Sequence, residues 1–597
     1  MHVVLAHDPS GSVRVHDVPG AATGEARTVP PAALPAVVRE AEPGGPGGTG
    51  PAPRWTWDDT SAWYAGLLAA GVRVERAHDL RLCHRILRHS SLAASSALAS
   101  APAGPWDEAP LTVAAPVGMD RAPQPDALFD LAAGAGPRSA GRPGTRRQAS
   151  AVDGAEGPVA ELRAQEAAVA DSPAPGRLRL LLAAESAGAL VAAEMRHAGL
   201  PWRADVHDAI LTEALGPRPP EGRRPARLEE LAGRIRDALD APPTLNPDSH
   251  PDLLKAMQYA GVGARSLRKW ELSTIDHPVV APLLEYKNLY RLLTANGWHW
   301  LDTWVTGGRF RPEYVVGGVV TGRWASSGGG ALQLPKGVRR AVVADPGWRL
   351  VVADAAQLEP RVLAGMAGDE AMASAGRDGD LYAGIVASGA VDTRELAKVG
   401  MLGALYGGTT GASAQVLPRL ARTFPRAIAL VEEAARAGER GGVVTTRLGR
   451  SSPPPGSDWD AAQAGAFDDE AGADAAARAR SYTRSWGRFT RNFVVQGTAA
   501  EWALCWLASI RRRLWAMGVV PEGGGAQGLA PAPFADRPHL VFFLHDEVVV
   551  HAPAAMADDV ADAVRAAADE AGRLLFGGFP VDFPLTVATV DSYADAK

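Results

Sequence analysis

Two acidic positions that lie far apart in the sequence could together bind divalent cations. Asp354 follows the apolar run at 349–353, which predicts a buried strand, and a carboxylate at the end of such a strand faces the crevice where α/β proteins bind ligands. His545, Asp546 and Glu547 interrupt a second apolar run, and the simplest arrangement is a hairpin whose tip presents the two acids. If the two strands are neighbours, Asp354 and Asp546 converge, and Mg²⁺ would relieve the repulsion between their carboxylates. Two ions about 4 Å apart would assist an in-line phosphoryl displacement.

A predicted helix between these acidic segments carries residues that could bind a triphosphate. Four residues of RELAKVGMLGALYG recur every four positions and form a gently spiralling row on one helix face: Arg394, Lys398, Leu402 and Tyr406. The two cations could hold phosphates, and the tyrosine could lie near a base. Taken alone, the row also fits an amphipathic helix with a solvated edge, and each acidic segment also fits an ordinary turn. Their occurrence together favours phosphoryl transfer.

Composition narrows the possible classes of protein. The 597 residues suggest three or four domains at roughly 150 residues each. The net charge of −6 means that a polyanionic partner must meet a local basic patch. The two cysteines, Cys83 and Cys505, exclude a disulfide scaffold and a zinc module built on four cysteines. We find no run of 18 or more apolar residues and no signal-peptide pattern, so we expect no membrane contact and a cytoplasmic location.

The elements that must position these residues follow from periodicity. MHVVLAHD and VRVHDVPG predict a hairpin, and the alternation of strands and helices over residues 1–100 indicates an α/β unit. Residues 101–170 are rich in Ala, Pro and Gly, and we interpret them as a disordered linker that buries too little apolar surface to offset chain entropy. Apolar residues at three-to-four spacing predict helices over 171–305, after which strands and glycine loops begin.

These segments together resemble the polymerase module of family A DNA polymerases, the bacterial DNA polymerase I type. VVADAAQLEPRVLA, RELAKVGMLGALYG and LHDEVVV are similar to that family's motifs A, B and C. TGRWASSGGGALQLP, VVTTRLGR and GRFTRNFVVQGTAAEWAL match its connecting segments, so the likeness runs in order over roughly residues 175–597. It implies a multidomain α/β protein of the right-hand polymerase class, with a thumb and its lead-in helices at 171–305, a palm divided between 306–370 and 490–597, and fingers at 371–489.

The resemblance also implies a role for each matching residue. Asp354 and Asp546 would bind two Mg²⁺ ions, Glu547 would support them, and Lys398 would be the proton donor to pyrophosphate. Glu359 would block a ribose 2′-hydroxyl. The deoxynucleoside triphosphate would be bound by Arg394, Lys398, Tyr406, Glu359, Leu402, Gln357 and Tyr382. The primer–template DNA would be bound near the growing end by Arg323, Arg361, Arg488, Asn492, Gln496 and His545. We expect the protein to act as a monomer.

Several positions depart from the family pattern. Ala355 and Ala356 stand where Tyr and Ser are usual, and Pro360 stands where Leu is usual. Leu402 replaces an aromatic residue, and Tyr382 occupies a position where a triphosphate-binding His is common. The metal ligands and the cationic pair are intact, so these changes bear on fidelity, sugar discrimination and speed rather than on the existence of activity.

Residues 1–100 resemble the RNase H-like 3′–5′ exonuclease domain that precedes the thumb in this family. VERAHDLRLCHRILRHS is similar to its second motif, but the position four residues after Asp79, where an Asp is required, is Cys83. No Asp-x-Glu occurs in residues 1–50. A neutral thiol cannot replace an anionic oxygen ligand of Mg²⁺. We therefore expect a degenerate exonuclease domain without activity, and no 5′ nuclease domain before it.

Three functions are compatible with the sequence. We favour a template-directed DNA polymerase that works in repair or replication. The first alternative is a 3′–5′ exonuclease or a bifunctional enzyme, against which the missing acids weigh. The second is a non-catalytic DNA-binding relic, against which four retained residues weigh: Asp354, Asp546, Arg394 and Lys398.

Overall fold

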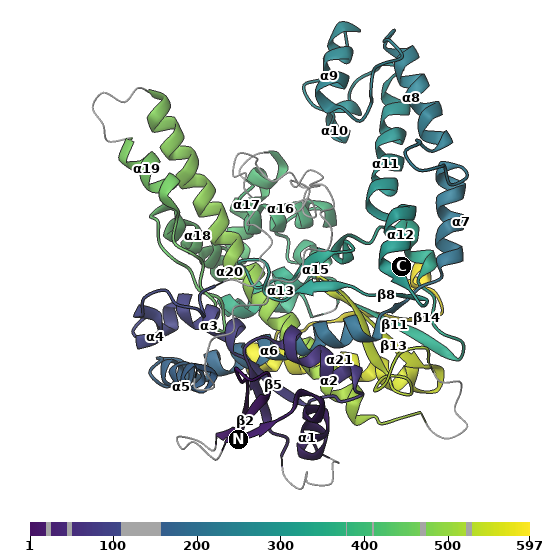
Figure 1. Cartoon of the computed structure of the whole chain (residues 1–597). Helices are drawn as coiled ribbons and strands as arrows, with labels where there is room; N and C mark the ends of the chain where they lie inside the picture. Colours follow the sequence, from purple (N-terminus) through teal and green to yellow (C-terminus); the bar gives the residue numbers. More distant parts are fainter. Residues whose placement is uncertain are drawn as a thin grey trace. The chain divides into compact units, whose positions relative to one another are not determined.

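The structure is a computed structural model that describes residues 1–18, 26–43, 51–108, 157–377, 379–408, 411–465, 473–520 and 528–596 (Figure 1). The chain divides into two compact units. The first consists of Met1–Ala198, Glu313–Gly328 and Pro346–Thr589. The second consists of Gly199–Pro312, Gly329–Asp345 and Val590–Lys597. Each unit is assembled from segments that are distant in the sequence.

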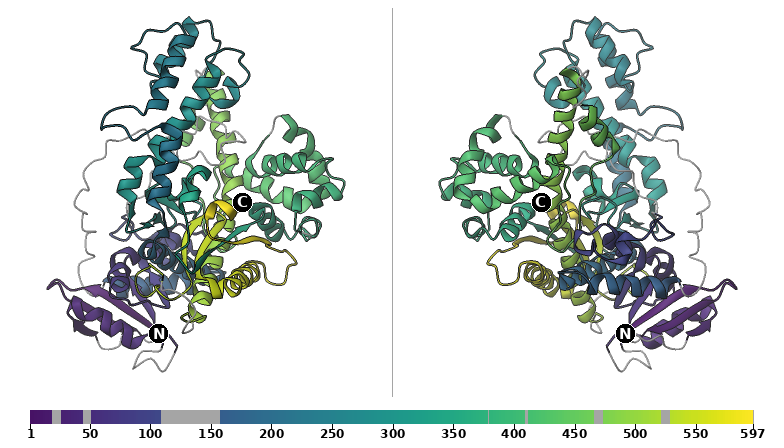
Figure 2. Two further views of the ribbon diagram at one scale, coloured as in Figure 1. Left: turned by 90° about the vertical axis from the view of Figure 1, so that its right-hand side faces the viewer. Right: turned by 90° about the vertical axis from the view of Figure 1, so that its left-hand side faces the viewer.

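A five-stranded mixed sheet with strand order β3-β2-β1-β4-β5 begins the first unit and is drawn in purple in Figure 2. β1 (His2–His7) pairs antiparallel with β2 (Val13–Val18), as the predicted hairpin requires, and parallel with β4 (Arg54–Trp57). β3 (Ala26–Val29) lies at one edge and β5 (Arg76–Asp79) at the other. The accompanying helices are α1 (Leu34–Ala41), α2 (Thr60–Ala69), α3 (Leu80–His89) and α4 (Ala97–Ser100).

Helix α5 (Gly157–Ala170) corrects the predicted linker at 101–170, of which residues 109–156 lie outside the described residues. Leu162 of α5 is fully buried beside Val4 and Leu80, and the side chain of Gln165 donates a hydrogen bond of 2.8 Å to the carbonyl of Leu80. The prediction of disorder was therefore wrong for residues 157–170. A few apolar residues at helical spacing suffice to bury one face of an alanine-rich segment against a neighbouring helix.

A four-stranded sheet with order β12-β13-β11-β14 positions the acidic segments of the first unit. β11 (Trp348–Ala355) pairs antiparallel with β13 (Glu547–Pro553), and both are buried along almost their entire length. β12 (His539–Leu544) and β14 (Leu585–Val590) form the two edges. Helices α6 (Pro175–Ala198) and α21 (Ala557–Phe576) pack against these strands, and a short hairpin is formed by β9 (Glu313–Val315) and β10 (Ala325–Gly328).

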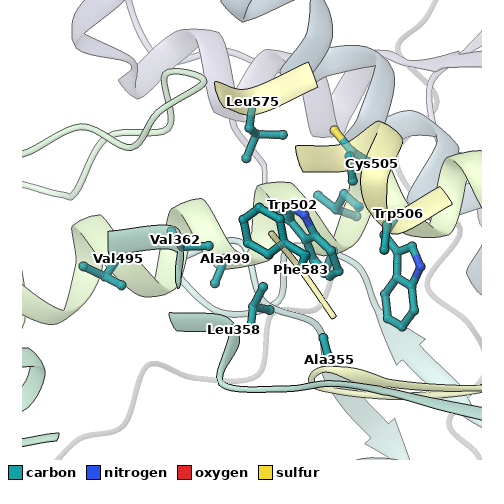
Figure 3. Packing of buried hydrophobic residues seen from close by; sticks show 14 of the residues in the cluster. Ala355, Leu358, Val362, Val495, Ala499, Trp502, Cys505, Trp506, Leu575 and Phe583 are labelled. Atoms are coloured by element: carbon teal, nitrogen blue, oxygen red, sulfur yellow. The ribbon is translucent and has the colours of Figure 1, made fainter. Parts of the chain in front are cut away.

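The long helix α20 (Ala473–Ala516) forms the centre of the hydrophobic core (Figure 3). Its residues Val495, Ala499, Trp502, Cys505 and Trp506 pack with five residues from other segments: Ala355, Leu358, Val362, Leu575 and Phe583. Among the described helices, α20 contains an 18-residue window that is long and apolar enough to cross a membrane, and 89% of that window is buried inside the protein. Its apolar character is therefore accounted for by packing in the core.

Helical segments between β11 and α20 complete the first unit. They are α13 (Leu358–Ala367), α14 (Glu370–Ala375), α15 (Leu381–Ala387), α16 (Arg394–Tyr406), α17 (Gly411–Thr423), α18 (Pro425–Glu439) and α19 (Ser457–Gly465). α16 is the helix predicted from the row of four residues. Thr393 caps its start by accepting a hydrogen bond from the amide of Leu396, and Gly407 ends it with a φ of 72°.

The second unit is mainly helical, as predicted for residues 171–305. Its helices are α7 (Ala204–Leu215), α8 (Ala226–Ala238), α9 (His250–Tyr259), α10 (Lys269–Leu272), α11 (Val280–Asn296) and α12 (Trp298–Trp304), and its small sheet contains β6 (Leu200–Pro201), β7 (Val305–Thr306) and β8 (Arg309–Phe310). The predicted boundary at residue 171 differs from the observed division, because α6 packs against α2, β5 and α20 and so belongs to the first unit.

A buried charge network ties α2 and the segment after it to α6 and α20 within the first unit. Glu194 of α6 accepts hydrogen bonds from Arg511 at 2.7 and 3.0 Å and from the hydroxyl of Tyr64 at 2.6 Å. Arg73 lies 3.4 Å from the same carboxylate. Although burial opposes the charge, the two guanidinium groups and these hydrogen bonds hold the pKa of Glu194 below its ordinary value.

We predict that Glu194→Gln lowers the free energy of unfolding by about 3–5 kcal/mol, because two buried guanidinium groups lose their counter-charge. The contribution of this carboxylate is present above its ordinary pKa of 4.5 and is lost as the pH falls below that value, so the variant should also show a weaker loss of stability on acidification. Urea unfolding at several pH values measures both effects. Glu230→Gln removes the carboxylate of an exposed ion pair with Arg227 and is the control. Equal effects of the two substitutions would contradict the prediction.

Candidate active site

The antiparallel pairing of β11 with β13 brings the two acidic segments together. Asp354 lies opposite Glu547 in the register, and the amide of Ala355 donates a hydrogen bond of 2.9 Å to the carbonyl of Asp546. Asp354 and Asp546 are half-buried, whereas Glu547 is only 2% exposed. The predictions that the strands are neighbours and that a hairpin presents Asp546 are confirmed, whereas Glu547 is buried at the start of β13 rather than presented at the tip.

The turn of this hairpin has an unusual backbone. His545 has a φ of 60°, in the left-handed region that residues other than glycine seldom occupy. Burial, followed by the nearby Arg323 guanidinium, lowers the pKa of His545 to about 4. The imidazole is therefore uncharged at neutral pH, although it lies next to Asp546 in the chain and near the Arg323 guanidinium.

The donor chemistry of this strand end fits magnesium. Asp354 and Asp546 offer only oxygen ligands, and Mg²⁺ is held in proteins by one or two carboxylates together with water and substrate phosphates. In the part of the chain that the structure describes, no three side chains of His, Cys, Asp or Glu form a complete metal site by themselves. The two carboxylates would consequently share a bound ion with water or with oxygens of the substrate.

A hydrogen-bonded network joins four residues that the sequence assigned to the site: Arg323, Glu359, Tyr406 and Gln496. Glu359 forms an ion pair with Arg323 through one carboxylate oxygen, and its other oxygen accepts a hydrogen bond of 2.5 Å from the Tyr406 hydroxyl. The Gln496 amide donates to the same hydroxyl at 3.3 Å. Burial and the adjacent Glu359 charge raise the pKa of Tyr406, so its hydroxyl stays protonated. The Glu359 carboxylate on α13 thus holds the Tyr406 hydroxyl of α16, and this hydroxyl in turn contacts Gln496 of α20.

A second cluster forms around Asp380, a residue that sequence reasoning missed. Its carboxylate accepts hydrogen bonds from Nε of Arg394 at 2.7 Å and from Nε2 of Gln357 at 2.9 Å. It also caps the start of α15, because it accepts from the amides of Tyr382 and Ala383. An Asp directly before the apolar helix LYAGIVA is the signal that could have identified this cap.

Tyr382 belongs to the same cluster. The guanidinium of Arg394 lies 5.6 Å from the centre of the Tyr382 ring, within range of a cation–π interaction. Burial, followed by the Glu359 charge, raises the pKa of Tyr382 to about 12. The structure therefore places Gln357, Tyr382 and Arg394 together, and the acid that organises them is Asp380.

The predicted row on α16 changes from exposed to half-buried along the helix. Arg394 and Lys398 are exposed, and Leu402 and Tyr406 are half-buried. Lys398 makes no hydrogen bond or ion pair with any residue that the structure describes. Its ammonium group is accordingly available to a ligand, whereas Tyr406 is already fixed by its hydrogen bond to Glu359.

The three predicted DNA contacts on α20 share one face of that helix. Arg488, Asn492 and Gln496 are spaced four apart and are all half-buried. Asn492 has a buried Oδ1 atom without a hydrogen-bond partner among the described residues, and such an atom calls for a ligand or water. A Cβ atom at Gly407 would lie 2.8 Å from the Arg488 side chain, so glycine is required for this close approach at the end of α16.

Arg361 does not lie with these residues, and its predicted contact with DNA is wrong for this structure. The side chain is 1% exposed. Its guanidinium donates hydrogen bonds to the carbonyls of Ala356 at 2.9 Å and Gly376 at 2.8 Å, and to that of Asp582 at 3.1 Å. Arg361 therefore fixes the loops around α13 from inside the fold. From the sequence alone, an arginine with this role cannot be told apart from one that binds phosphate.

The N-terminal positions expected to matter for exonuclease chemistry are structural. Asp79 is 3% exposed and accepts hydrogen bonds from the amide and hydroxyl of Thr60 and from the amide of Leu82. Burial raises the pKa of Asp79 to about 7. Cys83 is fully buried, and this burial raises the pKa of its thiol. Neither side chain presents an ionised oxygen ligand on the surface.

Similarity to solved structures agrees with the fold described above. The POL domain of Pol1 from M. smegmatis, solved in complex with DNA primer-template and dNTP, is 16% identical to this chain and superposes with a TM-score of 0.65. The similarity covers 100% of this chain and 96% of that domain. At this level of identity, the likeness establishes the fold.

Sequence comparison establishes the family. Thermostable DNA polymerase I of Thermus filiformis is 27% identical over 358 residues, which are 54% of this chain and 37% of that protein. The corresponding protein of a Thermus thermophilus strain is 27% identical over 401 residues, with coverages of 60% and 42%. The chain spans less than half the length of these two relatives. The model of the family described as DNA polymerase family A matches residues 254–592, which is more than half of the chain. The chain therefore belongs to DNA polymerase family A.

Proposed function

We propose that this chain is a template-directed DNA polymerase that adds deoxynucleotides to a primer 3′ end and releases pyrophosphate. The observation that carries the proposal is the register of β11 and β13, which sets Asp354 opposite Glu547 and joins Ala355 to Asp546. Membership of family A supports the same reaction. Phosphoryl transfer needs mainly positioning and charge neutralisation, which carboxylates, metal ions and cations can provide.

Asp354 and Asp546 would hold two magnesium ions, with Glu547 supporting them from its buried position. When bound, the ions would neutralise charge on the phosphates and activate the attacking hydroxyl. Arg394 and Lys398 would bind the triphosphate from their exposed places on α16, and Lys398 would donate a proton to the departing pyrophosphate. Gln357, Leu402 and Tyr382 would complete the contacts to the nucleotide.

Glu359 would exclude a ribose 2′-hydroxyl. This proposal is supported by its two anchors, the ion pair with Arg323 and the hydrogen bond from Tyr406, which hold the carboxylate in one place. A fixed carboxylate can obstruct a neighbouring hydroxyl, whereas a mobile one can move aside. Tyr406 would border the base pair that forms at the primer end.

Primer–template DNA would lie against α20 and the hairpin of β12 and β13. Four half-buried polar side chains would contact it: Arg323, Arg488, Asn492 and Gln496. His545 would do so from the hairpin turn. Acceptors in the minor groove are largely common to all base pairs, so contacts of this kind suit an enzyme that copies every sequence. The complex of the M. smegmatis domain with DNA primer-template and dNTP supports these partners.

We further propose that residues 1–100 form an RNase H-like exonuclease domain without activity. The uses of Asp79 as a helix cap and of Cys83 as a core residue support this proposal. The monomeric state and the cytoplasmic location stay predictions from the sequence.

We predict that Asp354→Ala and Asp546→Ala each lower the rate of primer extension by at least about a thousandfold, because the metal ions would lose half of their protein carboxylates. Single-turnover extension of a labelled primer with Mg²⁺ measures the rate. Asp558→Ala, on the exposed side of α21, is the matched control and should extend at the normal rate. A folded Asp354 or Asp546 variant that keeps a tenth of the activity would disprove the assignment.

We predict that the wild-type protein does not shorten a labelled, mismatched primer when Mg²⁺ is present and nucleotides are absent. The reason is that Cys83 is a buried thiol where a metal ligand would be needed. Gel analysis over hours detects removal of single nucleotides. The same preparation must extend a matched primer when nucleotides are supplied. Shortening that persists in the Asp354→Ala variant would show that the N-terminal domain is an active nuclease.

We predict that Tyr406→Phe increases the use of ribonucleotides relative to deoxynucleotides by about tenfold, because Glu359 loses one of its two anchors. Competing incorporation of the two nucleotides opposite one template base gives the ratio. Tyr482→Phe removes the hydroxyl of another half-buried tyrosine on α20 and should leave the ratio unchanged. An unchanged ratio in Tyr406→Phe would mean that Arg323 alone fixes the carboxylate.

A further inference from the structure

A cavity of about 380 Å³ lies in the N-terminal part of the first unit. Strands β1, β4 and β5 and helices α5 and α6 contribute its lining. Six of the lining side chains are polar: His2, Arg54, His78, Gln165, Glu166 and Arg179. The rest of the wall is apolar and includes Leu162, Val169 and Leu182. The volume is within the range of sites that bind small organic ligands.

Positive charge in this cavity is incompletely balanced. Arg54 donates one side-chain hydrogen bond, of 3.1 Å, to the carbonyl of Ala77 and pairs with no carboxylate among the described residues. Arg76 is close enough that its charge, added to the effect of burial, lowers the pKa of Arg54. Arg179 is exposed and likewise has no ion pair within the described part of the chain. Among the described residues that line the cavity, Glu166 is the single carboxylate, and its side chain is half exposed.

The two histidines in the wall are uncharged rings that hydrogen bonds hold in place. His2 Nδ1 is hydrogen-bonded to the Thr56 hydroxyl at 2.8 Å, and His78 Nε2 is hydrogen-bonded to Gln165 Oε1 at 2.8 Å. Burial lowers the pKa of His2 to about 3 and that of His78 to about 4. His2 Nε2 lies 3.8 Å from the Glu166 carboxylate. Both rings are held in place by neighbours and border the cavity.

We propose that this cavity binds a phosphate-bearing anion of about mononucleotide size without a metal ion. Guanidinium groups match the geometry of phosphate oxygens, and two of them lie in the lining against one carboxylate. The apolar part of the wall can contact the uncharged part of such a ligand.

The residues around the cavity favour binding of a phosphate-bearing ligand over its metal-dependent hydrolysis. His78 Nδ1 is 3.8 Å from the Cys83 sulfur, so the cavity adjoins the position where a metal-dependent nuclease would need Asp. A site with two cations and one carboxylate repels metal ions and attracts phosphate. The inference concerns binding alone and does not depend on the proposed polymerase reaction.

Calorimetric titration of the full chain in EDTA tests the proposal with two probes, inorganic phosphate and thymidine 5′-monophosphate. Both should bind, and the nucleotide should bind more tightly because the apolar wall adds contacts. Arg54→Gln and Arg179→Gln should each raise the Kd by about tenfold, since each removes a charge-assisted interaction. Arg234→Gln, an exposed arginine of α8, is the matched control and should leave the Kd unchanged.

A variant of the polymerase site separates the two possible locations of binding. Arg394→Gln combined with Lys398→Gln should keep the affinity for thymidine 5′-monophosphate, and the Arg54→Gln and Arg179→Gln variants should keep primer extension. Three results would overturn the proposal: no binding at millimolar ligand, binding that requires Mg²⁺, or binding lost with Arg394 and Lys398 but not with Arg179. Arg179 is exposed on α6, so its substitution tests the site even if the Arg54 variant is unstable.

Discussion

The antiparallel register between β11 and β13 is the constraint on which the candidate active site depends. A shift of one residue along a strand turns every side chain to the opposite face. Here packing on both faces of the sheet opposes such a shift. Leu350 and Val352 of β11 are buried on one face, and Val548 and Val550 of β13 are buried on the other. The apolar cores on the two faces of the sheet therefore determine which carboxylates meet at its end. Asp354 and Asp546 are positioned by this register.

Glu359 plays a comparable part for the surrounding helices. It lies five positions after Asp354 in the sequence, yet its carboxylate reaches Arg323 and Tyr406 rather than the strand ends. The departures from the family pattern are consistent with this division. Ala355 is 2% exposed and packs in the core beside α20, so its change from a larger residue affects packing.

Much of the site was predictable because it depends on periodicity. The apolar runs before Asp354 and around Asp546 predict strands, and the structure contains both strands. The four-residue spacing of the row on α16 predicts a helix, which the structure also contains. Spacing alone does not report burial, however. Arg361 has the same residue type and a similar sequence context to a phosphate-binding arginine, but it lies inside the fold.

Other features depend on tertiary contacts that could not be predicted from the sequence. Asp380 acquires its role from Gln357 and Arg394, which are distant in the chain. Helix α5 is ordered because α3 and α6 cover it, although its composition alone predicts a linker. The assignment of α6 to the first unit likewise follows from its neighbours. Local composition predicts which segments can be helical, and packing decides which of them become part of a core.

The length and the contacts of helix α20 limit which neighbouring helices can move independently of it. Its 44 residues correspond to about 66 Å at 1.5 Å per residue. It contacts α18 and α19 near its beginning and α6, α21 and β12 farther along. At the crossing with α18, a side chain on Gly438 would collide with Thr490, so the two helix backbones are in close apposition. Rotation of α18 would consequently carry α20 with it, whereas α16 and α17 are linked more weakly to this pair and can shift with less disturbance of it.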